Sequence, residues 1–206
     1  MSNPLVCELN FGMGNIRSLQ KAFEHLGQPV QVTDRADDII KADAVLLPGD
    51  GAFGRAMSEL QRLEMVEAVR EFHQAQKPIL GICIGFQLLF DSSNEFGSHK
   101  GLGFLNGGLR RLDAPGKPVP HMGWSETRFV NAGRLNQGIP EKVYFYYVHS
   151  FCVPGVHDSA TAASNYGEDF TAVVEKDNLF GTQFHPEKSQ RWGLKILENF
   201  ISILRN

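Results

Sequence analysis

The chain has 206 residues, of which 42% are hydrophobic and 21% are charged, and its formal net charge is −3. A chain of this length can bury a substantial core and is most simply one domain over residues 1–206. The nearly balanced charge disfavours a nucleic-acid groove or a membrane surface. The three cysteines form no Cys-x-x-Cys pair, so we expect no disulfide framework and no metal site. The N-terminus lacks a secretion signal and no apolar run reaches about 18 residues, which favours a cytoplasmic protein.

Strands and helices alternate through the first 90 residues. Short apolar runs predict strands at residues 5–9, 30–33 and 44–47 and another beginning at Ile79. Helical spacing of apolar residues predicts helices at residues 16–26 and 55–74. This alternation is typical of a parallel sheet that is covered by helices on both faces.

The pattern changes after Asp91. Residues 92–108 are polar and rich in glycine and are expected to form a surface excursion, and residues 119–125 are expected to form a polar loop. Residues 143–151 form an aromatic strand, and the short strands at 160–165, 171–175 and 179–184 suit antiparallel pairing. A closing helix is predicted at 190–204. The expected fold is therefore α/β, with an open, mostly parallel central sheet, helices on both faces and a small antiparallel extension.

Cys83 stands between Gly81 and Gly85, directly after the strand predicted at Ile79. Glycines two positions away on either side are typical of a nucleophile elbow, a strained strand-to-helix turn that exposes its central side chain. A helix N-terminus at this turn would favour the thiolate form of the cysteine. The alternative is an ordinary buried core cysteine in an apolar run.

A cysteine nucleophile needs a base, and the base needs a third group that holds its ring. His185 follows a predicted strand, and Glu187 comes two residues later. In an extended segment these two side chains would point the same way, so a carboxylate could select the imidazole tautomer. A surface His-Pro-Glu turn remains the alternative.

Acyl chemistry also requires hydrogen-bond donors for an oxyanion. The backbone N–H of Ile84, directly after Cys83, is one candidate. The glycine-rich loop that begins at Pro48 is the other, and its backbone at Asp50 and Gly51 could present or withdraw an N–H. A plain strand-to-helix turn is the competing interpretation of this loop.

Two stretches together carry a family resemblance: residues 81–89, which read GICIGFQLL, and residues 181–189, which read GTQFHPEKS. They resemble the class I (triad) glutamine amidotransferases. Within that family the chain is most similar to the amidotransferase subunits of imidazole glycerol phosphate synthase, an enzyme of histidine biosynthesis. The subgroup signals are residues 12–18, 120–124, 146–151 and 165–167, and the resemblance runs from about residue 5 to residue 200.

The resemblance implies that Cys83 attacks the side-chain amide of glutamine, with His185 and Glu187 completing a catalytic triad. Ammonia would leave, and a thioester on Cys83 would be hydrolysed to glutamate. No cofactor is implied. The residues implied to bind the substrate are Gly49, Gln87, His149, Ser150 and Phe151, and His149 would not be a second base.

The resemblance also implies a partner, a (β/α)8-barrel cyclase subunit that would receive the ammonia in a heterodimer. Asn15, Trp124 and Lys188 would lie at the interface between the subunits. One departure from the family pattern concerns the glycine-rich loop, where Asp50 replaces a residue that is usually apolar. A carboxylate near a developing negative charge is unfavourable unless it points outward, so the switching behaviour of the loop stays open.

Three other functions compete with this one. A paralogous amidotransferase could supply ammonia for amidino groups on surface sugars, and the departures from the family pattern keep that reading open. A cysteine peptidase or γ-glutamyl hydrolase could use the same elbow, although Gln87 and the aromatic strand argue against it. A non-catalytic regulatory scaffold is the fourth reading, which the intact set of Cys83, His185 and Glu187 disfavours.

Overall fold

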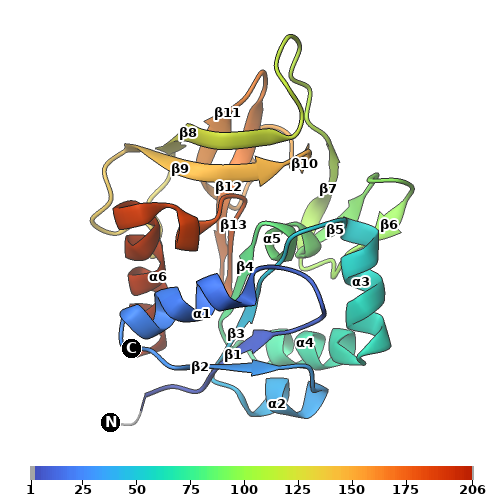
Figure 1. Cartoon of the computed structure of the whole chain (residues 1–206), viewed down its shortest axis with the longest axis vertical. Coiled ribbons are helices and arrows are strands. Elements are labelled where there is room, and N and C mark those ends of the chain that lie inside the picture. The colour runs from blue at the N-terminus through green and yellow to red at the C-terminus, as the bar shows by residue number, and fades with distance from the viewer. Residues whose placement is uncertain (1–2, 206) are drawn as a thin grey trace.

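The computed structural model describes residues 3–205 and contains two sheets. The larger sheet has nine strands in the order β2-β1-β3-β4-β13-β12-β11-β8-β9 (Figure 1). Its strands are β1 (Val6–Leu9), β2 (Val30–Thr33), β3 (Ala44–Leu47), β4 (Ile79–Ile82), β8 (His121–Phe129), β9 (Lys142–His149), β11 (Ala160–Asn165), β12 (Asp169–Lys176) and β13 (Leu179–Thr182). The smaller sheet has four strands, β10 (Phe151–Cys152), β7 (Leu105–Arg111), β5 (Phe90–Ser93) and β6 (His99–Lys100), in that order.

The two halves of the larger sheet differ in strand direction. From β2 to β13 neighbouring strands are parallel, and β1, β3, β4 and β13 are buried along their whole length. Parallel strands covered on both faces are expected to be almost continuously apolar, which holds for these four apart from Glu8 on β1 and Thr182 on β13. From β13 to β9 the pairing is antiparallel. The expected α/β fold is confirmed, and its antiparallel part is larger than a small extension.

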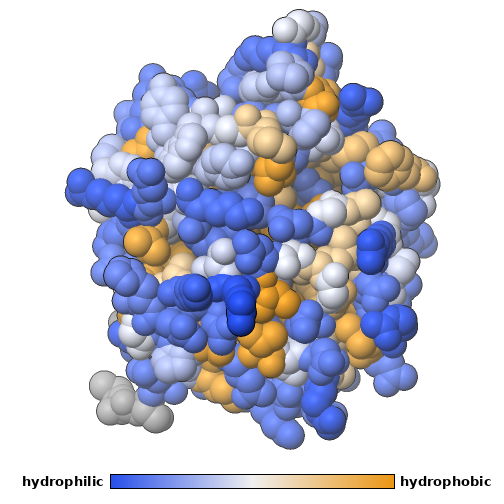
Figure 2. Space-filling view, viewed as in Figure 1, coloured by the Kyte–Doolittle hydropathy of each residue, from blue (hydrophilic) through white to orange (hydrophobic). Residues whose placement is uncertain are grey.

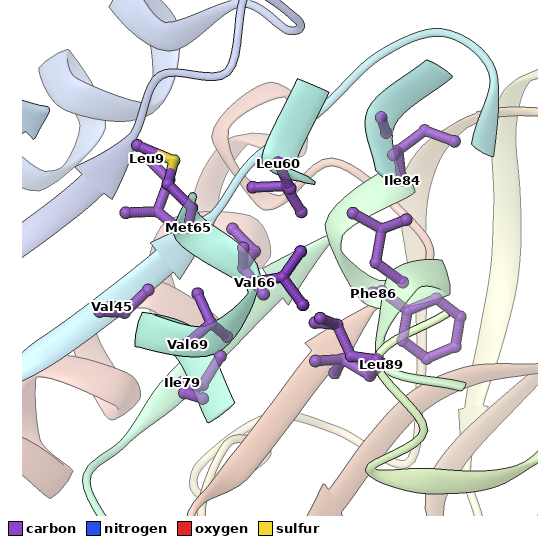
Figure 3. Packing of buried hydrophobic residues seen from close by; sticks show 14 of the residues in the cluster. Leu9, Val45, Leu60, Met65, Val66, Val69, Ile79, Ile84, Phe86 and Leu89 are labelled. Carbon is purple, nitrogen blue, oxygen red and sulfur yellow. The ribbon is translucent and has the colours of Figure 1, made fainter. Parts of the chain in front are cut away.

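Helices cover both faces of the parallel half. Helices α2 (Ala36–Lys41), α3 (Phe53–Arg62) and α4 (Met65–Gln74) pack on one face, in a cluster with Leu9 and Val45. Figure 3 shows this cluster from close by, with Leu60, Val66 and Val69 turned toward the strands. Helices α1 (Ile16–His25) and α6 (Gln190–Leu204) pack on the other face (Figure 1). The alternating apolar pattern therefore builds two separate cores on one sheet.

The single helix predicted at residues 55–74 is wrong, because the structure has two helices there. The break falls at Glu64, whose φ of 57° lies in the left-handed region and ends the helical path. Apolar residues of α3 and of α4 pack into the same cluster, so in the sequence their spacing resembles that of one long helix. Neither glycine nor proline marks the turn, and helix α2 was also not predicted.

The chain after Asp91 is more regular than expected. Residues 92–108 lie largely at the surface, and they also supply strands of the smaller sheet. Residues 119–125 are not a loop, because His121 begins β8, which pairs with β9 at the end of the larger sheet. Trp124 thus lies on a strand, opposite Tyr146. No helix within residues 3–205 is long and apolar enough to cross a membrane.

Candidate active site

Cys83 occupies the tip of a sharp turn between β4 and α5 (Ile84–Leu88). Its φ of 54° and ψ of −105° are strained for a residue with a side chain. A Cβ on Gly85 would lie 1.7 Å from the carbonyl oxygen of Leu47, and a Cβ on Gly81 would lie 2.6 Å from the carbonyl oxygen of Gly85. Both glycines are therefore needed for packing, and the turn has the geometry that the spacing predicts for an elbow.

His185 follows β13, the strand that pairs with β4, so the parallel sheet places it beside Cys83. Its backbone N–H donates to the carbonyl of Tyr146 over 2.9 Å, and its Nδ1 lies 2.8 Å from Glu187 Oε1. Because the carboxylate can only accept, Nδ1 carries the proton and Nε2 is left for the thiol. Glu187 lies in the 3₁₀ turn η1 (Pro186–Lys188), so the extended geometry expected for this segment is wrong although the contact forms.

The charges around His185 favour its protonated form. Burial alone would lower the pKa of His185, but the Cys83 thiolate and the Glu187 carboxylate beside it raise the pKa to about 10. Two negative charges that face one buried imidazole stabilise the imidazolium. The site therefore favours the imidazolium form of His185, an acid that can protonate a departing nitrogen.

A pocket of about 310 Å³ opens in front of Cys83. Most of the predicted site residues line it: Asp50, Gly51, Cys83, Ile84, Gln87, His149, Ser150, Phe151 and Lys188. They come from four separate parts of the chain: the loop after β3, the elbow with α5, the end of β9 with the residues that follow it, and the turn η1. The volume suits a small amino acid.

The glycine-rich loop lies directly over the elbow. A Cβ on Gly49 would come within 3.0 Å of Ile84 Cβ and within 3.6 Å of the backbone nitrogen of Gly85. Gly51 has a φ of +102°, a backbone conformation that residues with side chains rarely adopt. The loop therefore packs closely against Ile84 and Gly85, the two residues that follow Cys83.

Asp50 points into the site rather than away from it. Its Oδ1 lies 3.6 Å from His185 Nε2, on the side of the ring opposite the Glu187 contact. The Asp50 side chain is 43% exposed, so water screens this interaction in part. In this conformation a carboxylate competes with the Cys83 thiolate for the base nitrogen.

Gln87 lines the pocket, but its amide is already used within the protein. Gln87 Nε2 donates to the carbonyl of Phe151 over 2.9 Å and to Gln183 Oε1 over 3.0 Å. These bonds tie the elbow helix to Phe151, at the start of β10, and to Gln183, directly after β13. The side chain therefore shapes the wall of the pocket that the resemblance assigns to substrate binding.

His149 belongs to a hydrogen-bonded chain of neutral rings. Its Nδ1 donates to the carbonyl of Phe151 over 3.0 Å, so its Nε2 accepts from His121 Nδ1 over 3.0 Å, and His121 Nε2 accepts from Ser125 Oγ over 2.8 Å. Burial lowers the pKa of His149 to about 3 and that of His121 to about 4. Both rings stay neutral, and both ring nitrogens of His149 are already used, one by the carbonyl of Phe151 and the other by His121.

The residues predicted at a partner interface are spread over the surface. Asn15 is exposed and caps α1, its side chain accepting from the backbone N–H of Ser18 over 3.3 Å. Trp124 is 46% exposed and contacts Tyr146 edge to face, near the exposed Met122 and Tyr144. Lys188 lines the pocket. Figure 2 shows a mostly hydrophilic face with small hydrophobic areas between the polar ones.

Sequence reasoning missed Glu95, Tyr146 and Val148 as lining residues of the pocket. Glu95 is buried, and its Oε2 accepts from the backbone N–H of Phe53 over 2.7 Å. It lies in the stretch that was expected to be a surface excursion, so nothing in the local pattern indicated it. Within residues 3–205 no group of three or more His, Cys, Asp or Glu side chains could hold a metal ion.

Comparison with known proteins places this chain in a family. The profile described as "Glutamine amidotransferase class-I" matches residues 8–204, so the chain belongs to the class I glutamine amidotransferases. Among curated relatives it is 48% identical to the imidazole glycerol phosphate synthase subunit HisH of Moorella thermoacetica, over 96% of this chain and 94% of that protein. It is 44% identical to the HisH subunit of Aquifex aeolicus, over 93% of each chain.

Solved structures agree on the fold. A glutamine amidotransferase structure matches with a TM-score of 0.76 at 15% identity, over 97% of this chain and 99% of that one. The PurLQS structure from Thermotoga maritima matches with a TM-score of 0.76 at 21% identity, over 98% of this chain and all of that chain. At these identities the likeness concerns the fold alone.

Proposed function

We propose that this chain is the glutaminase subunit of imidazole glycerol phosphate synthase in histidine biosynthesis. The observation that carries the proposal is the geometry at Cys83, where an elbow cysteine faces a histidine that is held by a carboxylate over 2.8 Å. The assignment to histidine biosynthesis is supported by HisH relatives, which are 39–48% identical to this chain over nearly its whole length.

The first half of the reaction uses the thiolate–imidazolium pair. Cys83 Sγ attacks the side-chain carbonyl carbon of glutamine, and the backbone N–H of Ile84 stabilises the oxyanion that forms. His185 then gives its Nε2 proton to the amide nitrogen, the carbon–nitrogen bond breaks, and ammonia leaves. The acyl group remains on Cys83 as a thioester.

The second half regenerates the enzyme. His185, now neutral, takes a proton from water, and the resulting hydroxide attacks the thioester carbon. The carbon–sulfur bond breaks, glutamate is released, and the proton on His185 restores the ion pair with Cys83. Glu187 holds the ring in one tautomer through both halves by accepting a hydrogen bond from Nδ1.

A resting state with low activity follows from the contact between Asp50 and His185. As long as the carboxylate lies 3.6 Å from Nε2, it stabilises the imidazolium and opposes the oxyanion that the adjacent backbone should bind. A movement of the loop that turns Asp50 outward would relieve both effects. We assign this movement to the binding of a partner.

That partner is a (β/α)8-barrel cyclase subunit, which forms a heterodimer with this chain in the cytoplasm and uses the ammonia. The relatives are named as subunits of a synthase, and this supports the existence of a second subunit. Met122, Trp124 and Tyr144 offer exposed apolar side chains on the last two strands of the sheet, which suits an interface anchor. Asn15 and Lys188 complete the proposed contact surface.

The test measures glutamate release from glutamine by the purified chain alone, with the cyclase subunit, and with the cyclase subunit and its ribotide ligand. Low activity alone that rises sharply with the liganded partner, and is lost in Cys83→Ala, supports the proposal. Complex formation without any glutamate release would point to a regulatory scaffold instead. Release that depends on a different partner and sugar acceptor would point to the surface-sugar paralogue.

A further inference from the structure

Gln183 is a fully buried amide directly after β13, two residues before His185. Its backbone N–H donates to the carbonyl of Ala172 over 2.9 Å, so the pairing of β13 with β12 extends to this residue. Side chains alternate along an extended segment, and Phe180 and Phe184 belong to the core under α1 and α6. The Gln183 side chain therefore lies on the other face, together with α5, whose apolar residues belong to the opposite core.

Two hydrogen bonds fix the direction of the Gln183 amide. The carbonyl oxygen of Phe151 can only accept, so the Gln87 atom that lies 2.9 Å from it is the donor Nε2. The same nitrogen lies 3.0 Å from the Gln183 amide, and the atom that it meets there must be the acceptor Oε1. Gln183 Nε2 is therefore the other end of the amide, and it lies 3.9 Å from Cys83 Sγ.

The sulfur of Cys83 thus lies between an acceptor and a donor. The carbonyl oxygen of Val148 is 3.6 Å from Sγ, and because it can only accept a proton it stabilises the thiol form. Gln183 Nε2 donates a proton instead, so its contact stabilises a negative charge on the sulfur. Cys83 and Gln183 are both buried, which makes these electrostatic preferences stronger than they would be in water.

We propose that the Gln183 side-chain amide is a further catalytic group, which donates a hydrogen bond to Cys83 Sγ when the sulfur carries a negative charge. This role rests on the proposed function, because the sulfur is negative at two points of that reaction. It is negative when it attacks the amide carbon of glutamine, and again when the carbon–sulfur bond of the thioester breaks. Gln183 transfers no proton. Gln87 is its positioning residue, since it holds Oε1 and so directs Nε2 toward Sγ.

The other polar groups near Cys83 differ from Gln183 because they ionise. His185 is the base, held by Glu187. The ionisable side chains that line the pocket in front of Sγ are Asp50, Glu95, Tyr146, His149 and Lys188. An amide has no charge at any pH, so it adds no titration of its own. Its loss should therefore move the pH profile of Cys83 reactivity along the pH axis without changing the shape of the profile.

The test is the rate at which iodoacetamide alkylates Cys83 in the full chain, measured over a range of pH for wild type and Gln183→Met. Methionine has a similar length but no N–H donor, so the variant profile should lie about one pH unit higher, as expected for the loss of a hydrogen bond to a charged group. Identical profiles would overturn the proposal. The measurement needs neither glutamine nor a partner, so it gives a result even if the proposed function fails.

The other two cysteines contribute little to this rate. Burial raises the pKa of Cys7 to about 11 and that of Cys152 to about 12, so both react slowly. Cys83→Ala measures the background that remains.

Gln87→Met tests the same hydrogen bond from its other end. With Oε1 released, the Gln183 amide can rotate away from Sγ, so the profile should shift in the same direction by a smaller amount. In the double variant the shift should equal that of Gln183→Met alone, because the donor is already absent. Shifts that simply add would contradict the proposed arrangement. If Gln183→Met does not fold, an unshifted Gln87→Met profile overturns the proposal by itself.

Gln28→Met is the matched control for the loss of a buried amide. Gln28 is also fully buried, and its Nε2 donates to the carbonyls of Pro4 and Pro29 over 2.9 and 3.1 Å, outside the pocket. Both Gln28→Met and Gln183→Met should lower the melting temperature, but only Gln183→Met should shift the alkylation profile. An equal shift in Gln28→Met would mean that loosening of the structure causes the effect, and the proposal would be wrong.

Discussion

The imidazole of His185 lies between two carboxylates with opposite effects. Glu187 meets Nδ1 over 2.8 Å and orients the ring, whereas Asp50 lies 3.6 Å from Nε2, the atom that the thiol needs. The first contact is buried and the second is half exposed, so the first is the stronger. The proposed resting state therefore differs from the catalytic state in having Asp50 beside Nε2 of His185.

Asp50→Asn tests whether the Asp50 carboxylate lowers the activity of the unpartnered chain. The substitution keeps the size of the side chain and removes its charge, so the unpartnered chain should release glutamate about 1.4- to fivefold faster, as expected for a half-exposed ion pair of about 0.2–1 kcal/mol. Steady-state glutaminase assays measure the effect. Asp37→Asn, at an exposed pair with Arg35, is the matched control and should change nothing. A slower Asp50→Asn enzyme would contradict an opposing role for Asp50.

Much of the site could be predicted at the residue level. The spacing of Gly81, Cys83 and Gly85 encodes the elbow, and the contact between His185 and Glu187 follows from two residues that are near in sequence. The direction of the Asp50 side chain could not be predicted, because it depends on a loop conformation. Glu95 was missed because its place in the pocket depends on tertiary packing of a polar stretch.

At the scale of elements, the elbow depends on the close approach of β3, β4 and α5. A methyl group on Gly85 would collide with the carbonyl of Leu47, and backbone atoms cannot move aside as a flexible side chain can. The geometry of the nucleophile is thus set by the packing of neighbouring strands. The glycines are required by space as well as by conformation.

Gly85→Ala should therefore cost about 3 kcal/mol or more of unfolding free energy, at the upper end of the range for overpacking. Chemical denaturation of the purified chain measures this cost. Gly108→Ala is the matched control. A Cβ there would lie 2.9 Å from Ser92 Oγ, and that hydroxyl can rotate away. Equal stability of the two variants would show that the elbow tolerates a side chain.

Element positions were predicted well where a periodic apolar pattern had clear ends. Strands β2 and β3 and helix α6 have the predicted bounds. The break at Glu64 could not be predicted, because its left-handed turn contains neither glycine nor proline. Strand β8 was read as a loop because its large, polar and glycine residues mix the usual signals, and pairing with β9 overrides local preference.

At the scale of the whole molecule, the sheet brings together residues that are far apart in the chain. Strand β13 pairs with β4, so His185 meets Cys83 across about a hundred residues of sequence, and β9 adds the other wall of the pocket. The parallel half carries the nucleophile and the antiparallel half carries the exposed aromatic surface at Trp124. One continuous sheet thus connects the proposed chemistry to the proposed partner surface.

Trp124→Ala tests that surface. Truncating a central aromatic anchor usually costs more than about 1 kcal/mol, so the affinity for the cyclase subunit should fall by about fivefold or more. Calorimetric titration of the two subunits gives the affinity. Phe96→Ala removes an aromatic side chain that is 89% exposed elsewhere and serves as control. If the two variants bound equally well, Trp124 would lie outside the interface.

The buried acid at Glu8 also predicts how stability depends on pH. The pKa of Glu8 rises from an ordinary value of 4.5 to about 8 on folding, so between these values the folded state holds more protons than the unfolded state. Stability due to Glu8 is complete below pH 4.5 and falls as pH rises toward 8, by up to about 1.4 kcal/mol per pH unit. Glu8→Gln should remove this slope, as measured by denaturation at several pH values. A slope equal to that of wild type would contradict a buried, protonated Glu8.

The central claim is that Cys83 forms a covalent bond to the side-chain carbon of glutamine. The most direct measurement is the mass of the chain, in complex with the cyclase subunit, after reaction with a chloroketone analogue of glutamine. We predict one adduct, located on the peptide that contains Cys83, formed more slowly when glutamine is present and absent in Cys83→Ala. An adduct on Cys7 or Cys152, or labelling of Cys83 that glutamine does not slow, would contradict the account.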